Sequence, residues 1–207
     1  MLRRLGLWLV LAGVLGGCAA RPPAGDDWHA VIVGAASAVV TLTGAAGTLG
    51  SGFFVDGSGL VVTNAHLAAV PELRVLDRAG VQHRPELVFS DPDLDLAVLR
   101  IAATAPAVLT LREAPARIGE PVLALGNPLG LGLAASRGIV SAEPAATGYL
   151  QRLQTDAAIN AGNSGGPLLD AEGRVIGVVN ARTAVGQGVG FAVPADALRR
   201  VLAGLTR

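Results

Sequence analysis

Short apolar runs separated by glycine or proline turns recur along most of this chain, and they constrain its fold more than any other feature. The runs begin near residue 31, are rich in valine and leucine, and are short enough to be β-strands. Helical crossovers between them are missing from most of the chain, which argues against a doubly wound parallel sheet. The pattern therefore predicts an all-β fold, a sandwich or a pair of barrels. The predicted strands are 39–43, 50–55, 60–63, 73–76, 87–89, 96–101, 122–125, 138–142, 175–180 and 189–193.

One helix is predicted, at the end of the chain. Pro194-Ala195-Asp196 is typical of a helix start, and leucine and valine then recur at helical spacing. Leu198, Val201, Leu202 and Leu205 would share one face.

The first residues resemble an export signal. Arg3 and Arg4 precede an apolar stretch that is shorter than a typical membrane-spanning helix. Small residues then lead to Cys18. The run before Cys18 also resembles the bacterial lipobox, which predicts a signal peptide at 1–17 and lipidation of Cys18. The alternative is an ordinary signal peptide that is cut near Ala19-Ala20. We expect an exported protein of the cell envelope, lipid-anchored and facing the periplasm, at the outer membrane if the organism is Gram-negative.

Residues 18–30 are predicted to be a tether, because they contain Pro22-Pro23 and Gly25 followed by two acids. The remainder, 31–207, has the length of one all-β domain, with two barrels expected at about 31–112 and 113–207. Cys18 is the only cysteine, so no internal disulfide can form. The chain carries 16 basic and 16 acidic residues, which gives no electrostatic argument for a nucleic-acid partner.

Ser164 is the candidate nucleophile. It lies in the run GNSGG at 162–166, where glycines on both sides can expose a hydroxyl beside backbone N–H groups. Glycine-serine clusters are mostly loops, so this run indicates a nucleophile only if a candidate histidine and a candidate carboxylate are also present in the chain.

His66 is the candidate base among the three histidines of the chain. It follows an apolar strand in a segment of small residues, although a buried histidine in such a place is usually structural. His29 in the tether and His83 beside Arg84 are interpreted as solvated surface residues.

Asp95 is the candidate carboxylate. It directly precedes an apolar strand and should be partly buried at the strand entrance, whereas Asp91 and Asp93 are interpreted as turn residues. Asp56, the acid that would suit a subtilisin-like order, lies in a predicted hairpin turn.

The order of these residues along the chain separates the possible folds. No histidine follows Ser164, which excludes the serine–acid–histidine order of α/β-hydrolases. The order His66, Asp95, Ser164 is that of chymotrypsin-like double β-barrels, with the active site between the barrels.

Several motifs together resemble the HtrA/DegP-type bacterial trypsin-like serine proteases, over about residues 31–205. They are GSGF at 50–53, VTNAH at 62–66, DLAVL at 95–99, GNPLG at 126–130, GIVSA at 138–142, TDAAINAGNSGGPL at 155–168 and GVGFAVP at 188–194.

The resemblance implies a serine endopeptidase. Ser164 would attack the peptide carbonyl, His66 would transfer the proton, and Asp95 would hold the imidazole in the useful tautomer. The loop of Gly162, Asn163 and Ser164 would form the oxyanion hole, through the backbone N–H groups of Gly162 and Ser164. The resemblance implies no metal and no cofactor.

The resemblance also places Ala158, Ile159 and Asn160 in the wall of the specificity pocket. With no aspartate at its base, this pocket should prefer a small or medium apolar residue before the scissile bond. Asp156 is the nearest acid, and the family does not use it as a charge receptor.

Departures from the family pattern concern regulation. Ala161 stands where the family usually has proline, and the expected architecture is a protease domain without a PDZ domain. We expect protein or peptide substrates, from unfolded or exposed segments in cell-envelope quality control, and a possible homotrimer by resemblance. The alternatives are a catalytically silent binding or chaperone-like module, and an esterase-like hydrolase that uses the same triad.

Overall fold

A computed structural model describes residues 27–127, 132–144, 152–180 and 188–205 of the chain. Cys18, the predicted signal peptide and most of the predicted tether lie outside the described residues.

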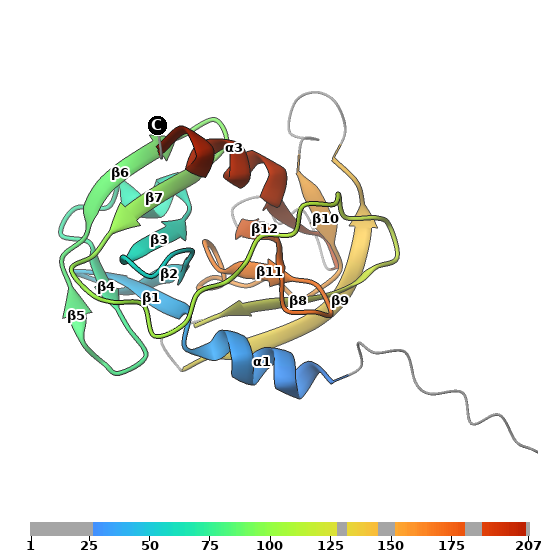
Figure 1. The fold of residues 1–207 in the computed structure, drawn as a ribbon, viewed down its shortest axis with the longest axis horizontal. Coiled ribbons are helices and arrows are strands. Elements are labelled where there is room, and N and C mark those ends of the chain that lie inside the picture. The colour runs from blue at the N-terminus through green and yellow to red at the C-terminus, as the bar shows by residue number, and fades with distance from the viewer. Residues whose placement is uncertain (1–26, 128–131, 145–151, 181–187, 206–207) are drawn as a thin grey trace, which may run out of the picture.

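The described residues form two antiparallel sheets and three helices (Figure 1). The elements are, in chain order, α1 (Trp28–Ala36), β1 (Val39–Gly44), β2 (Gly47–Phe54), β3 (Leu60–Thr63), α2 (Ala65–Ala68), β4 (Arg74–Leu76), β5 (Gln82–His83), β6 (Glu86–Asp91), β7 (Leu96–Arg100), β8 (Pro121–Gly126), β9 (Ala134–Ala142), β10 (Leu153–Thr155), β11 (Pro167–Leu169), β12 (Val175–Asn180), β13 (Gly190–Pro194) and α3 (Ala195–Leu205).

The first sheet is barrel-like and has seven strands in the order β5-β4-β1-β2-β3-β7-β6. The second sheet is a closed barrel with the order β10-β13-β12-β11-β8-β9. The predicted all-β, double-barrel fold with a short C-terminal helix is therefore confirmed. The chain passes from the first sheet to the second at Leu109 and Thr110. The N–H of Leu109 donates to Phe54 O of the first sheet, and the carbonyl of Thr110 accepts from Val175 N of the second.

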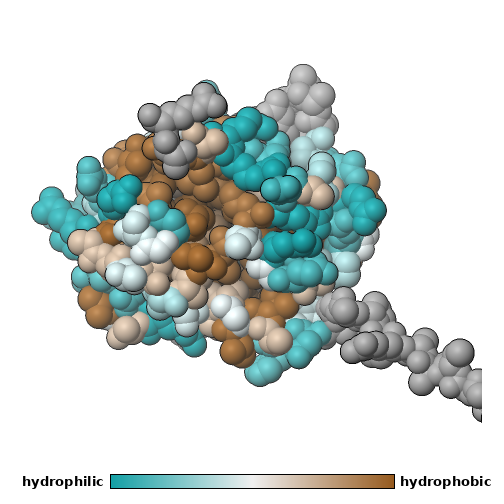
Figure 2. Space-filling view, in the orientation of Figure 1, coloured by the Kyte–Doolittle hydropathy of each residue, from teal (hydrophilic) through white to brown (hydrophobic). Residues whose placement is uncertain are grey.

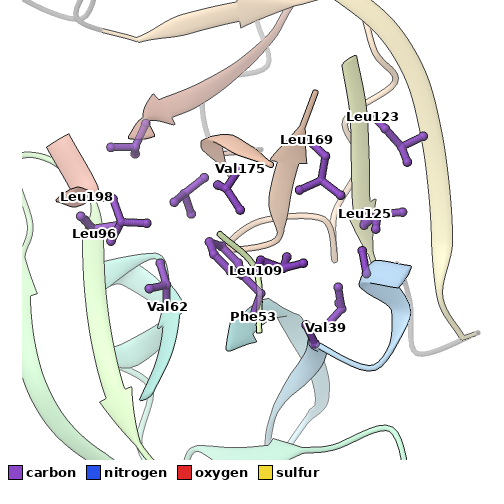
Figure 3. Packing of buried hydrophobic residues seen from close by; sticks show 14 of the residues in the cluster. Val39, Phe53, Val62, Leu96, Leu109, Leu123, Leu125, Leu169, Val175 and Leu198 are labelled. Carbon is purple, nitrogen blue, oxygen red and sulfur yellow. The ribbon is translucent and has the colours of Figure 1, made fainter. Parts of the chain in front are cut away.

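The main hydrophobic core lies between the two sheets. Side chains of the first sheet point toward those of the second, with Leu109 of the connection and Leu198 of α3 completing the contact (Figure 3). The labelled members are Val39, Phe53, Val62, Leu96, Leu109, Leu123, Leu125, Leu169, Val175 and Leu198. Two smaller clusters lie inside the sheets, one in each. The shared core holds the sheets together, so that loops from both of them meet between the barrels.

Helix α3 packs its apolar face onto this core, as the sequence predicts. Leu198 is fully buried, and Val201, Leu202 and Leu205 are partly buried against the same cluster. Hydrophobic residues also gather on the surface between α3 and α1, where the core approaches solvent (Figure 2).

Helix α1 was not predicted. Apart from His29 its sequence is apolar, and residues 31–33 are β-branched, so that neither a helical stripe nor alternation is visible. Asp27 caps it by accepting a hydrogen bond from Ala30 N at 3.0 Å, and the helix therefore begins inside the predicted tether. Trp28 is buried, and the guanidinium of Arg137 lies 5.1 Å from the centre of its ring.

All ten predicted runs form strands. Three further strands were missed, namely β5, β10 and β11, and none of them is longer than three residues. Strands this short carry too few residues for a periodicity signal.

Candidate active site

His66 and Asp95 meet because they lie at the ends of two paired strands. Thr63, the last residue of β3, pairs with Ala97 near the start of β7, and α2 with His66 begins just after β3. The Nδ1 atom of His66 lies 2.8 Å from Asp95 Oδ2 and 3.0 Å from Oδ1. The backbone N–H of His66 also donates to Oδ1, at 3.0 Å. The carboxylate therefore fixes both the position of the imidazole and the tautomer in which Nδ1 carries the proton and Nε2 is basic.

Asp95 is held from both sheets. Asp95 is only 7% exposed. From the second sheet, the side-chain amide of Asn180, at the end of β12, donates to Asp95 Oδ2 at 2.8 Å. From the first sheet, Asn64 Nδ2 donates to the Asp95 carbonyl at 3.0 Å. The backbone of Asp95 has φ +54°, in the left-handed region that aspartate tolerates at a local cost.

The pKa of Asp95 lies below its ordinary value. Burial, the largest single cause, raises this pKa, but the hydrogen bonds from the side chain and backbone of His66 and the charges of His66 and Arg152 together lower it by more. Asp95 is therefore an anion at neutral pH, as an orienting partner of histidine must be.

Ser164 lies in the loop before β11 and is tied to the first sheet. Its carbonyl accepts from Ser51 N of β2 at 2.8 Å. The next residue, Gly165, has φ +79°, and a Cβ there would collide with Ser51 O and Thr63 Oγ1. This close approach brings the serine loop against the strand end from which His66 follows. The loop and the His66–Asp95 pair therefore lie side by side.

The turn before Ser164 is held at one peptide plane. Gly162 has φ +99°, and its carbonyl accepts from Ser51 Oγ at 2.7 Å. The N–H of Asn163, in the same peptide, donates to Asn160 O at 3.0 Å. The N–H of Asn163 is thus hydrogen-bonded within the turn. Of the three residues predicted for the oxyanion hole, Asn163 therefore does not direct its N–H to a substrate.

The predicted pocket residues lie along the edge of the second barrel. Ala158 and Asn160 are exposed, and Ile159 is partly buried against the inner cluster of this barrel and lies close to Gly190. Asp156 is also exposed, and its Oδ1 accepts a hydrogen bond from Ile139 N of β9 at 2.6 Å. The acid nearest the pocket therefore has a structural partner.

Sequence reasoning missed Asn180, Ser51 and Arg152. The guanidinium of Arg152 donates to Leu94 O at 2.5 Å and to Asp93 O at 3.2 Å. Burial lowers the pKa of Arg152, against the opposing charges of Asp95 and Asp91. Ser51 was part of a recognised motif, but neither its hydroxyl nor the other two side chains carry a local signal. Their partners are 58 to 111 residues away along the chain.

The remaining acid candidates lie where the sequence places them. Asp56 accepts hydrogen bonds from Ser58 and from Leu60 N in the turn between β2 and β3. Asp91 accepts from the N–H groups of Asp93 and Leu94, as a turn residue does.

One histidine prediction is confirmed and one is wrong. His29 is exposed, as expected. His83 is not a solvated surface residue, because its side chain is 14% exposed and its Nε2 lies 2.8 Å from Asp77 Oδ2. The pairing of β4 with β5, a strand that was not predicted, brings His83 beside Val75 and so toward Asp77.

A cavity of about 1060 Å³ lies behind the site, lined by Asp95, Asn180 and Arg152 but not by His66 or Ser164. Within the described ranges, no group of three or more His, Cys, Asp or Glu residues could hold a metal ion. No helix in the part of the chain that the structure describes is long and apolar enough to span a membrane.

Comparison with known proteins agrees with this geometry. The family described as "Trypsin-like peptidase domain" matches residues 50–178. The chain is 40% identical over 157 residues to a probable periplasmic serine endoprotease DegP-like of Hahella chejuensis, which covers 71% of this chain and 33% of that protein. It is also 40% identical over 164 residues to serine protease HTRA4 of Homo sapiens, with 74% and 34% covered. The chain thus spans about one third of the length of these curated relatives.

Solved structures give the same result. The serine endoprotease from Yersinia pestis superposes with a TM-score of 0.76 at 37% identity, covering 86% of this chain and 65% of that chain. The HtrA-type protease AlgW, solved with a decapeptide, superposes with a TM-score of 0.75 at 32% identity, covering 85% and 66%.

Proposed function

Because this chain belongs to the trypsin-like peptidase family, we propose that it is an HtrA-type serine endopeptidase that uses His66, Asp95 and Ser164. The observation that carries the proposal is the bidentate contact of His66 Nδ1 with the buried Asp95, next to a serine loop tied to the same sheet. Hydrogen bonding at Nδ1 leaves Nε2 as the basic nitrogen, which is the atom that must face the nucleophile.

The reaction proceeds through an acyl-enzyme. Ser164 Oγ forms a bond to the carbonyl carbon of the scissile peptide while His66 Nε2 takes the hydroxyl proton. When the C–N bond breaks, His66 returns this proton to the leaving amine. A water molecule then repeats the sequence on the ester, and Ser164 regains its proton. Asp95 stays ionised throughout and stabilises the transient imidazolium, which fits its lowered pKa.

The oxyanion donors in this proposal are the backbone N–H groups of Gly162 and Ser164. Asn163 contributes through the turn, since its own N–H bonds to Asn160 O. Glycine at 162 supports this role, because the backbone φ of +99° is accessible to glycine and strained for other residues. Such donors stabilise the negative charge that develops on the carbonyl oxygen.

The substrates in this proposal are unfolded or exposed protein segments with a small or medium apolar residue before the scissile bond. The wall formed by Ala158, Ile159 and Asn160 carries no charge, and the Asp156 carboxylate is engaged by Ile139 N. The uncharged wall therefore favours an apolar substrate side chain over a basic one.

We also propose that the protein acts in the cell envelope, attached through a lipid on Cys18 and facing the periplasm. The relative from Hahella chejuensis is named as periplasmic, and the motif at 1–18 supports export. In this arrangement residues 1–17 are removed, residues 18–27 remain as a tether before α1, and the protease domain follows, with trimer assembly as in related proteins. Incorporation of labelled palmitate into the wild type but not into Cys18→Ala tests the anchor.

The endopeptidase proposal is tested by digestion of an unfolded protein and of a peptide library with the exported, purified protein. We expect cleavage after Ala, Val or Leu, loss of cleavage in Ser164→Ala and His66→Ala, and normal cleavage in the control His29→Ala. If the wild type cuts no substrate while it still binds unfolded protein, the silent binding module replaces the protease. Cleavage after arginine would contradict the proposed apolar pocket but not the endopeptidase activity.

A further inference from the structure

Ser51 of β2 is fully buried, and all of its polar atoms are hydrogen-bonded. Its N–H donates to Ser164 O at 2.8 Å, and its carbonyl accepts from Thr63 Oγ1 at 2.8 Å. Its hydroxyl donates to Gly162 O at 2.7 Å and accepts from Asn127 N at 2.9 Å. One residue of the first sheet thus contacts the serine loop twice, at Ser164 and at Gly162.

The direction of the Ser51 hydroxyl proton follows from its partners. The backbone N–H of Asn127 can only donate, and the carbonyl of Gly162 can only accept. The hydroxyl must therefore accept a hydrogen bond from Asn127 N–H and donate one to Gly162 O. Asn127 is fixed in turn by its side chain, whose Nδ2 donates to Thr41 Oγ1 at 2.8 Å.

Gly162 needs such an anchor more than another residue would. Glycine has a wide choice of φ and ψ, so its peptide planes can rotate at low cost. The plane between Gly162 and Asn163 is held at its oxygen by Ser51 Oγ and at its N–H by Asn160 O. Removal of the Ser51 contact would leave the plane held at one atom only.

We propose that the Ser51 hydroxyl is a positioning element of the oxyanion hole. It holds the peptide plane between Gly162 and Asn163, and it thereby orients the two flanking peptide planes, whose N–H groups, those of Gly162 and Ser164, converge on the substrate oxygen. The inference rests on the proposed endopeptidase function. Ser51 does not touch the substrate, and its contribution is made through Gly162. Because the substrate oxygen carries most of its charge in the transition state, the loss of Ser51 Oγ lowers kcat and leaves KM nearly unchanged.

The test is Ser51→Ala, which removes Oγ and retains both backbone hydrogen bonds. We expect kcat to fall by about 10- to 100-fold, less than or similar to the loss of a direct oxyanion donor, with KM little changed. A peptide boronate, whose tetrahedral adduct places an oxygen in the hole, should lose affinity by the same factor. Ser51→Gly, which removes Cβ together with Oγ, should give the same fall in kcat.

The control is Val75→Ala, which removes buried volume from the inner cluster of the first sheet. It lowers stability without touching the serine loop, and it should retain wild-type kcat. A normal kcat in Ser51→Ala beside an active wild type overturns the inference and leaves the protease intact. An equal fall of kcat in Val75→Ala also overturns it, because general loosening then explains the effect. A wild type that neither cleaves peptide nor binds the boronate contradicts the proposed function and the inference together.

Discussion

The side-chain amide of Asn180 donates to Oδ2 of Asp95 at 2.8 Å, so a residue of the second barrel completes the hydrogen bonding of a carboxylate from the first. His66 approaches the same carboxylate from its own sheet. Asp95 therefore lies at the joint between the two sheets, and its orientation depends on how they pack.

Replacement of Asn180 by alanine should weaken catalysis without removing any reacting group. A hydrogen bond to a charged group contributes about 1.5–3 kcal/mol, and we expect kcat/KM to fall by about 10- to 100-fold. Asn180→Asp should be worse, since a second carboxylate beside Asp95 raises the pKa of Asp95. Steady-state kinetics over a range of pH measure both effects. Equal kinetics for wild type, Asn180→Ala and the exposed-turn control Ser58→Ala would contradict this role.

Replacement of Arg152 by methionine should make the fold more sensitive to acid. The folded-state pKa of Asp95 is depressed, so Asp95 stabilises the fold above its unfolded pKa, and this stabilisation disappears as pH falls through the folded value. Without the Arg152 charge the folded pKa of Asp95 rises, and the loss begins at higher pH. Acid unfolding followed by circular dichroism should show a midpoint at higher pH for Arg152→Met. Arg84→Met, on an exposed residue, is the matched control and should leave the midpoint in place.

Gly165 and Gly204 should respond to alanine in opposite ways. At Gly165, φ is +79° and a Cβ would collide with Ser51 O and Thr63 Oγ1, so Gly165→Ala should cost about 3 kcal/mol or more of unfolding free energy. At Gly204, in α3, nothing lies within 4 Å of the added Cβ, and Gly204→Ala should gain about 0.5–1 kcal/mol. Urea denaturation measures both changes. A Gly165→Ala protein as stable as the wild type would show that the serine loop is not pressed against β2 and β3.

The parts of the fold that could be predicted are those that a single segment encodes. The strands 60–63 and 175–180 are apolar runs with turn residues at their ends, and Leu198, Val201, Leu202 and Leu205 repeat at helical spacing in α3. Helix α1 could not be predicted, because residues 31–33 are Val-Ile-Val, and its packing against the core lies outside any local pattern. His83 was misread for a similar reason, since Asp77 reaches it only through the pairing of two very short strands.

The site shows the same division. His66, Asp95 and Ser164 could be selected because chain order and neighbouring glycines carry a signal. Asn180 and Ser51 could not, because each acts through one hydrogen bond to a residue far away along the chain. Such contacts depend on the packing of two sheets, which no local pattern encodes.

The most direct test of the proposed activity is covalent labelling of the purified wild type with a fluorophosphonate, followed by mass spectrometry of its peptides. The proposed triad predicts one adduct, on Ser164, with labelling lost in Ser164→Ala and strongly slowed in His66→Ala, and with His83→Ala still labelled at Ser164. A wild type that stays unlabelled, or an adduct that persists at an unchanged rate in His66→Ala, would contradict the assignment of Ser164 and His66 as nucleophile and base.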